Sequence, residues 1–153
     1  MQLKASAFNP GSDIPVQFTC DGSDTSPALI WTTPPEGTQS FALVMEDPDA
    51  PPGTFIHWLV YDLPASEREL TEGVAPKGPL SSGARQGRND FGKIGYGGPC
   101  PPPGPPHHYY FRLYALDTRL DLKAGATRAQ LDRAMRGHVL AQTELMARCR
   151  RHE

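Results

Sequence analysis

The chain has 153 residues, a length that predicts a single domain (residues 1–153) with a substantial hydrophobic core. Its formal net charge of −2 provides no broad positive field for nucleic acid or an anionic membrane, so any anion must be held locally. No apolar run approaches the roughly 18 residues of a membrane span, and the first residues contain no apolar stretch typical of a signal peptide. The composition therefore predicts neither a nucleic-acid partner nor an integral membrane segment.

The three cysteines, Cys20, Cys100 and Cys149, are odd in number and widely separated. This spacing is typical of neither a disulfide framework nor a zinc motif. We therefore expect free thiols in a reducing compartment, and the cytoplasm is the predicted location.

The 17 prolines and 15 glycines fall between apolar runs, where turns belong, and this pattern favours a loop-rich β fold. Residues 15–20 and 28–31 are predicted as short strands. Residues 40–46 (SFALVME) are nearly continuously apolar, as expected for a strand buried on both faces. Residues 55–63 and 107–116 are two further strong strand candidates.

The long stretch between residues 63 and 107 has no sustained periodicity, and glycine and proline dominate residues 91–106. A connection of this length inside a compact domain is usually functional. We interpret it as a loop region that forms a site.

The last part of the chain has helical character. Thr127 and Gln130 fit a capping box at the start of a helix, and Gly137 can end that helix in a left-handed turn. A second helix is predicted over about residues 139–150, with its apolar side chains on one side. We expect the two helices to dock on the β core.

Polar side chains gather at the ends of the strong strands. Asp47 and Asp49 follow one strand, His57 lies early in the next, and His107 and Tyr109 open the later one. Because strand side chains alternate, His107 and Tyr109 share one face of their strand. Convergence of these ends would bring carboxylate, imidazole and phenol groups together, and the amides of residues 95–98 could add donors.

Each of these features also has a simpler structural interpretation. Residues 47–51 (DPDAP) alone would be a rigid turn, because aspartate and proline are favoured there. His57 alone would be a hydrogen-bonded core histidine, Tyr109 a packed sheet residue and Cys100 an inert thiol. The order and spacing of the motifs carry more weight than any one of them.

Two long motifs occur in order along the chain. The first is DPDAP at residues 47–51, followed by His57 and Trp58. The second is GKIGYGGPCPP at residues 92–102, which leads into His107, His108 and Tyr109. The chain resembles the phosphatidylethanolamine-binding protein (PEBP) family, and more closely its bacterial Raf-kinase-inhibitor-like branch. The similarity runs over nearly the whole chain.

This resemblance implies a mainly β, Greek-key fold of two antiparallel sheets with peripheral C-terminal helices. It also implies a shallow pocket for phosphate-like groups and a cis proline, which would lie at Ala50–Pro51. By motif, four residues would surround the anion and three would form the wall. The four are Asp47, His57, Gly98 and Tyr109, and the three are His107, Asp49 and Pro51.

The chain departs from the family pattern at two places. The usual His-Arg-Tyr is His107-His108-Tyr109 here, and strand alternation predicts that His108 points away from the pocket. The proline-rich segment at residues 101–106 is longer than in many relatives, so it would alter the pocket rim.

Such a site can hold an anion without lysine or arginine, because imidazole, phenol and backbone N–H groups all donate to a phosphoryl oxygen. Asp47 would repel the anion unless it is protonated, the phosphate carries a proton, or Asp47 meets a ligand ammonium. Protonation of Asp47 would require burial to raise its pKa. Binding is therefore predicted to weaken at high pH.

Three functions are consistent with these residues. The first is binding of a phosphorylated small molecule or a phospholipid headgroup, with a kinase or protease as a further partner because family relatives inhibit such enzymes. The second is a hydrolase with Asp47 and His57 as an acid–base pair, or with a metal held by His57, His107 and Asp47. The third is an interaction protein with a vestigial pocket. We predict no cofactor and no catalytic residue, and a homodimer is possible.

Overall fold

The computed structural model describes residues 1–76 and 78–151, and most of its regular structure is β-strand. The larger of two antiparallel sheets has the strand order β6–β4–β3–β7–β8. Its strands are β3 (Ser40–Asp47), β4 (Phe55–Pro64), β6 (Arg85–Gln86), β7 (His107–Leu116) and β8 (Val139–Cys149).

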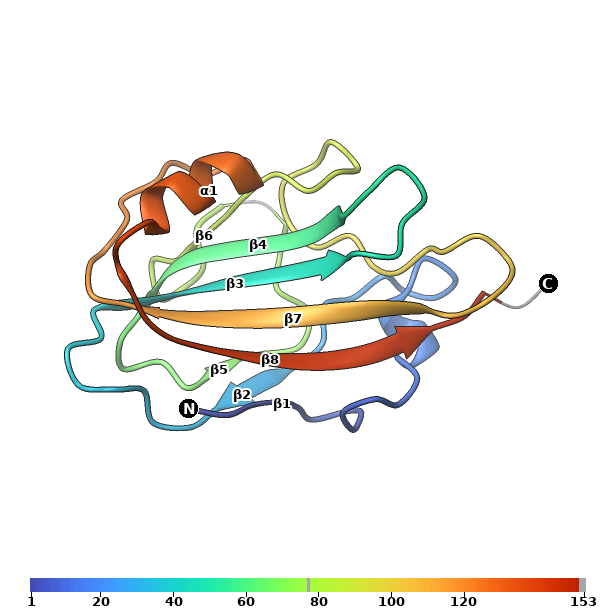
Figure 1. Ribbon diagram of the computed structural model, residues 1–153, viewed down its shortest axis with the longest axis horizontal. Coiled ribbons are helices and arrows are strands. Elements are labelled where there is room, and N and C mark those ends of the chain that lie inside the picture. The colour runs from blue at the N-terminus through green and yellow to red at the C-terminus, as the bar shows by residue number, and fades with distance from the viewer. Residues whose placement is uncertain (77, 152–153) are drawn as a thin grey trace.

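The smaller sheet has the order β1–β2–β5 and lies on one face of the larger one, as Figure 1 shows. Its strands are β1 (Leu3–Ala5), β2 (Leu29–Trp31) and β5 (Glu69–Leu70). A short 3₁₀ helix, η1 (Val16–Phe18), precedes β2, and the α-helix α1 (Arg128–Met135) lies on the other face of the larger sheet. The expected mainly β fold of two antiparallel sheets is confirmed. Among residues 1–76 and 78–151, the helices are too short and too polar to cross a bilayer.

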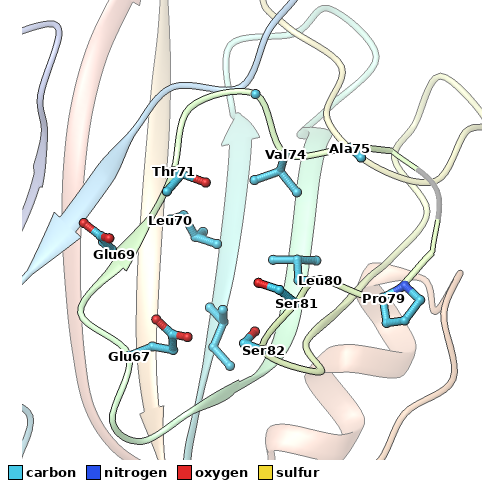
Figure 2. Close-up of a pocket in the computed structure, with 12 residues that line it drawn as sticks. Glu67, Glu69, Leu70, Thr71, Val74, Ala75, Pro79, Leu80, Ser81 and Ser82 are labelled. Carbon is cyan, nitrogen blue, oxygen red and sulfur yellow. The ribbon is translucent and has the colours of Figure 1, made fainter.

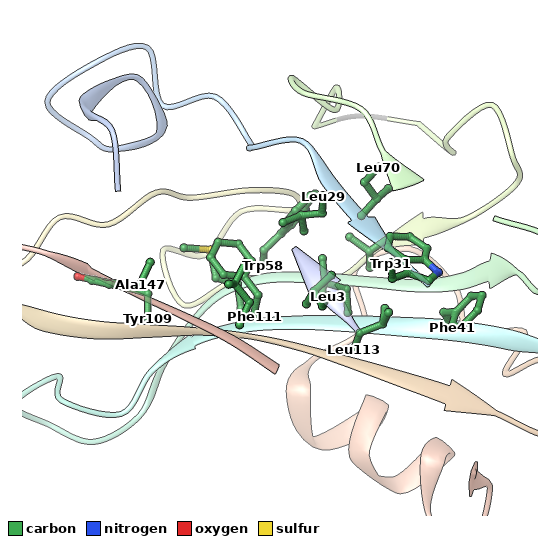
Figure 3. Close-up of a cluster of buried hydrophobic side chains, with 14 of the residues drawn as sticks. Leu3, Leu29, Trp31, Phe41, Trp58, Leu70, Tyr109, Phe111, Leu113 and Ala147 are labelled. Atoms are coloured by element: carbon green, nitrogen blue, oxygen red, sulfur yellow. The ribbon is translucent and has the colours of Figure 1, made fainter. Parts of the chain in front are cut away.

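Strand β3 is buried along its whole length, as its continuous apolar run predicts. Phe41 and Leu43 face the smaller sheet, whereas Ala42 and Val44 face the layer that contains α1. In Figure 3, Leu3, Leu29, Trp31 and Leu70 of the smaller sheet pack against side chains of the larger one. Burial on both faces holds β3 rigidly, so the residues at its end are well positioned.

The segment predicted as a strand at residues 15–20 is the 3₁₀ helix η1, so this prediction was wrong. The Phe18 amide donates to the Pro15 carbonyl, and the Thr19 amide donates to the Val16 carbonyl. These tight turns bury Phe18 but leave Val16 exposed. Alternation of two apolar residues is too short a signal to separate a strand from such a turn.

The second C-terminal helix predicted at residues 139–150 was also wrong, because this segment is strand β8. Residues 141, 143, 145, 147 and 149 alternate with more exposed neighbours, which is the period of a strand. Pairing with β7 along nearly its full length outweighs the local helical preference. Up to residue 151, the C-terminal part of the chain therefore has one helix, α1, instead of two.

The predicted capping box of α1 is confirmed. The Gln130 amide donates to the Thr127 hydroxyl oxygen, and the Thr127 amide donates to the Gln130 side-chain oxygen. Gly137 follows the helix with a positive φ of 82°, as expected for a left-handed turn.

Replacement of Thr127 with alanine should lower the free energy of unfolding by about 1 kcal/mol, because it leaves a first-turn amide without its acceptor. Urea denaturation of the wild type and T127A measures this difference. Replacement of the exposed Thr33 with alanine is a suitable control, and an equal loss in both variants would contradict the capping role.

Candidate functional site

A hollow of about 220 Å³ lies where β3, β4 and β7 meet the proline-rich loops. Five of the seven predicted site residues line it, and they are Asp47, Pro51, His57, His107 and Tyr109. The other lining residues are Ala50, Pro52, Phe55, Phe91, Cys100, Pro101 and Pro102. Neither lysine nor arginine occurs in this described lining.

Sheet register explains why residues so far apart in sequence meet here. Strand β3 lies between β4 and β7 and is antiparallel to both. Asp47 at the end of β3 pairs with Phe55 at the start of β4, while Glu46 pairs with Tyr110 near the start of β7. The end of one strand is thus placed beside the beginnings of its two neighbours.

His57 occupies a β-bulge. Met45 pairs with Trp58 and Glu46 pairs with Ile56, so His57 is the extra residue without a partner on β3. The bulge reverses the alternation of β4, because Ile56 and Trp58 belong to apolar clusters on opposite faces of the sheet. Bulges of this kind redirect a side chain, and here the bulge directs His57 toward the hollow.

The His57 ring is held in one orientation. Its Nδ1 lies 2.6 Å from the Gly97 carbonyl oxygen, and Phe55, Phe91 and Tyr109 contact the ring at 4.9–5.5 Å between ring centroids. The side chain is only 3% exposed. Burial lowers its pKa, and the Gly97 carbonyl and the Asp47 carboxylate offset this effect only in part.

Both carboxylate oxygens of Asp47 have partners within the protein. Oδ2 accepts a hydrogen bond from Nδ1 of His107 at 2.7 Å, and Oδ1 accepts one from the Asp49 amide at 2.8 Å. The carboxylate is buried. Asp47 therefore orients His107 and closes the turn that follows β3.

Tyr109 is 1% exposed and lies edge-on to the His57 ring. Burial raises the pKa of its phenol, and the nearby negative charge of Asp47 raises it further. The hydroxyl therefore keeps its proton at neutral pH and can donate a hydrogen bond.

The other two predicted residues do not line the hollow. Asp49 lies outside, where its Oδ2 accepts hydrogen bonds from the amide and Nδ1 of His108, and these bonds lower its pKa. The Gly98 amide donates to Oδ1 of Asp24 at 2.8 Å. A side chain at Gly98 would collide with the Phe18 carbonyl oxygen and Asp24, so this position accepts only glycine.

The prediction of free thiols was wrong for two of the three cysteines. Cys20 and Cys100 form a disulfide across 80 residues of sequence, while Cys149 is a buried free thiol. Wide spacing does not exclude a disulfide, because folding brings the segment after η1 against the wall of the hollow. The Cys20 amide also donates to the Pro99 carbonyl. The cytoplasmic location stays a prediction.

The expected cis bond at Ala50–Pro51 was also wrong, because residues 1–76 and 78–151 contain no cis peptide. The turn is closed by other means. The Gly53 amide donates to the Ala50 carbonyl, and Gly53 has a positive φ of 126°. The bond from the Asp49 amide to Asp47 closes its first half.

Sequence reasoning missed the apolar part of the site. Phe55 and Phe91 contact each other and His57, while Pro52, Pro101 and Pro102 complete the lining. The prolines lie within the motifs already identified, but their side chains were not assigned to the pocket. Phe91 gave no sequence signal, because it is a single aromatic residue in an irregular loop.

A larger hollow of about 440 Å³ lies beside β5. Figure 2 shows the carboxylates of Glu67 and Glu69 and the hydroxyls of Thr71 and Ser82 around it. This hollow contains neither histidine nor tyrosine, and its two carboxylates disfavour an anion. The smaller hollow is therefore the better candidate site despite its size.

The metal site suggested for His57, His107 and Asp47 has no support. Within residues 1–76 and 78–151, no three histidine, cysteine, aspartate or glutamate side chains are arranged to hold a metal ion.

The fold is thus that of a mainly β protein with two antiparallel sheets and a small hollow where β3, β4 and β7 meet. A sequence model described as phosphatidylethanolamine-binding protein matches residues 4–150. The chain therefore belongs to the phosphatidylethanolamine-binding protein family.

Individual relatives agree with this assignment. A UPF0098 protein of Aquifex aeolicus is 50% identical over 148 residues, which cover 95% of this chain and 86% of that protein. The crystal structure of E. coli YbcL, described as a new member of the mammalian PEBP family, is 34% identical with a TM-score of 0.92 and covers 99% of this chain and 98% of its own. The crystal structure of CT736, a putative PEBP homologue from Chlamydia trachomatis, is 41% identical with a TM-score of 0.89. The match covers 99% of this chain and 97% of that protein.

Proposed function

We propose that this protein binds small anions, specifically phosphate groups of small molecules or of phospholipid headgroups, in the hollow of about 220 Å³. The observation that supports this proposal is the meeting of His57, His107 and Tyr109 in one buried hollow, although they come from two strands far apart in sequence. Asp47 and Pro51 share the hollow, and Asp49 and Gly98 support it from outside.

The composition of the lining favours a small ligand with one polar group. Hollows that hold drug-sized ligands usually exceed about 300 Å³, so this one suits a headgroup or a side chain. The imidazoles and the phenol supply polar contacts, while Phe55 and Phe91 offer apolar contact. Hydrogen bonds to a charged acceptor contribute about 1.5–3 kcal/mol each.

Calorimetric titration of the purified protein with inorganic phosphate and with phosphoethanolamine tests this proposal. Replacement of His57 with alanine or of Tyr109 with phenylalanine should weaken binding roughly 10- to 100-fold, which corresponds to one hydrogen bond to a charged group. His108→Ala is the matched control. Because His108 lies outside the hollow, this variant should bind with the affinity of the wild type. Equal affinity in all variants, or no saturable binding by the wild type, would reject the proposal.

Regulation of a kinase or a protease is the partner role that we propose on the basis of relatives. In that case the hollow would receive a phosphorylated or acidic residue of the partner, and the H57A variant would lose the interaction. The predicted homodimer stays a prediction, and light scattering of the purified protein would test it.

One observation favours the alternative of a hydrolase. Asp47 orients His107 as an aspartate orients the general base of a hydrolytic triad, with 2.7 Å between Oδ2 and Nδ1. A hydrolase of this kind would use a water molecule as nucleophile, because Cys100 is oxidised and no serine or threonine occurs in the described lining. Turnover of p-nitrophenyl phosphate that H107A abolishes would favour this alternative.

A further inference from the structure

In both imidazoles of the hollow, Nδ1 is already hydrogen-bonded to another group of the protein. Nδ1 of His57 lies 2.6 Å from the Gly97 carbonyl oxygen, which can only accept a hydrogen bond. Nδ1 of His107 lies 2.7 Å from the Asp47 carboxylate, which also accepts. Each Nδ1 therefore carries the hydrogen atom, and each neutral ring has a bare lone pair on Nε2.

Nε2 of His57 has no hydrogen-bond partner within the described part of the chain. In the described residues, Nε1 of Trp31 is the one solvent-inaccessible side-chain nitrogen or oxygen that lacks a hydrogen-bond partner. Nε2 of His57 also lacks a partner, so it is accessible to solvent, and it is open to the hollow that His57 lines. A ring that is 97% buried thus directs an unsatisfied acceptor into the proposed binding site, since only 3% of His57 is exposed. An acceptor in this place repels an anion that carries no hydrogen.

The charged groups around His57 add to this repulsion. The carboxylates that face it are Asp47 from the end of β3, Asp24 from the loop after η1 and Asp90 from the loop after β6. On β7, Tyr109 touches the ring and His107 lines the same hollow. With neither lysine nor arginine in the described lining, a phosphate dianion would meet lone pairs and negative charge.

We propose that the hollow binds a phosphate monoester together with one proton, which is shared between a phosphoryl oxygen and Nε2 of His57. This inference rests on the proposed function and specifies its ligand class. A monoester has a second pKa near 6, so it can bring the proton as a monoanion. A diester has no such proton, so its binding requires protonation of the buried His57 ring, which is energetically unfavourable.

Proton uptake on binding tests the inference directly. Calorimetric titration with methyl phosphate in buffers of different ionisation enthalpy should give an uptake of about one proton per ligand at pH 8. Uptake should fall toward zero at pH 5, where the ligand already carries its proton. The association constant should decrease about tenfold per pH unit above pH 7. Binding at pH 8 without proton uptake would overturn the inference.

Two matched variants locate the proton. Glutamine in place of His57 offers a fixed amide instead of a titrating nitrogen, so H57Q should lose both the uptake and the pH dependence. H107Q should weaken binding, because His107 lines the same hollow. Its proton uptake per bound ligand should persist, since His107 does not carry the shared proton in this proposal. Retained uptake in H57Q, or loss of uptake in H107Q alone, would contradict the assignment.

A spectroscopic measurement avoids dependence on variants that fail to fold. Nitrogen-15 NMR of the wild-type imidazoles should find Nε2 of His57 without a hydrogen in the free protein at pH 8 and hydrogen-bonded with one after addition of methyl phosphate. An unchanged Nε2 signal in the saturated complex would overturn the inference.

Comparison of methyl phosphate with dimethyl phosphate completes the test. The monoester should bind at least tenfold more tightly at pH 7, although it carries the greater negative charge. Equal or tighter binding of the diester would overturn the inference but leave the proposed function intact. Absence of binding by both compounds at every pH would reject the proposed function itself.

Discussion

Replacement of Cys100 with serine should lower the free energy of unfolding by about 4.5 kcal/mol. The Cys20–Cys100 disulfide closes a loop of 80 residues, and in the chain-entropy account a cross-link of this span removes that much freedom from the unfolded chain. For a chain of this size the midpoint of thermal unfolding should fall by roughly 10–15 °C. Calorimetry and guanidinium denaturation of the wild type and C100S measure the two quantities.

The controls use the other cysteines. C20S should match C100S, and the double variant should lose little more than either, because all three remove the same cross-link. C149A keeps the cross-link, because Cys149 is a free thiol, so a dithiol reductant should destabilise C149A as much as the wild type. Wild-type stability that a dithiol reductant leaves unchanged would show that the cross-link contributes nothing.

Replacement of Trp58 with alanine should cost about 3–5 kcal/mol, the usual range for a large aromatic side chain in a core. Trp58 is fully buried, its ring meets Tyr96 edge-on at 5.4 Å, and its Nε1 donates to Oε1 of Gln86 at 2.7 Å. Its loss leaves a cavity and an unpaired acceptor on buried Gln86. Urea denaturation of the wild type and W58A measures the loss.

The same variant should also weaken anion binding, because Trp58 follows His57 directly and anchors the bulge that directs the imidazole. W58F is the matched control. It keeps most of the packing and loses the hydrogen bond to Gln86, so its stability should lie between those of W58A and the wild type. A loss below about 1 kcal/mol in W58A, with unchanged anion affinity, would contradict both roles.

Strands β3, β4 and β7 could be predicted because their signal is local and strong. The eight residues of β3 are buried on both faces of the sheet. The sequence of such a strand is typically a continuous apolar run, and here it is bounded by prolines and glycines. The capping box of α1 is equally local, because Thr127 and Gln130 are three residues apart. The motifs around Asp47, His57 and Tyr109 also indicated the family.

Other features depend on contacts between distant residues. Residues 139–149 form a strand because they pair with β7 along nearly the whole segment. Local periodicity in the sequence contains no information about that pairing. The bulge at His57 exists because β4 has one residue more than β3 over the same length. The disulfide forms because folding closes an 80-residue loop.

The sequence by itself determined the main strands, the family and the residue types available for a site, because apolar periodicity and motif spacing are properties of the chain alone. Only the tertiary structure decided the direction of each functional group. Hydrogen bonds to Gly97 and Asp47, from segments remote in sequence, fix which nitrogen of His57 and His107 carries a hydrogen.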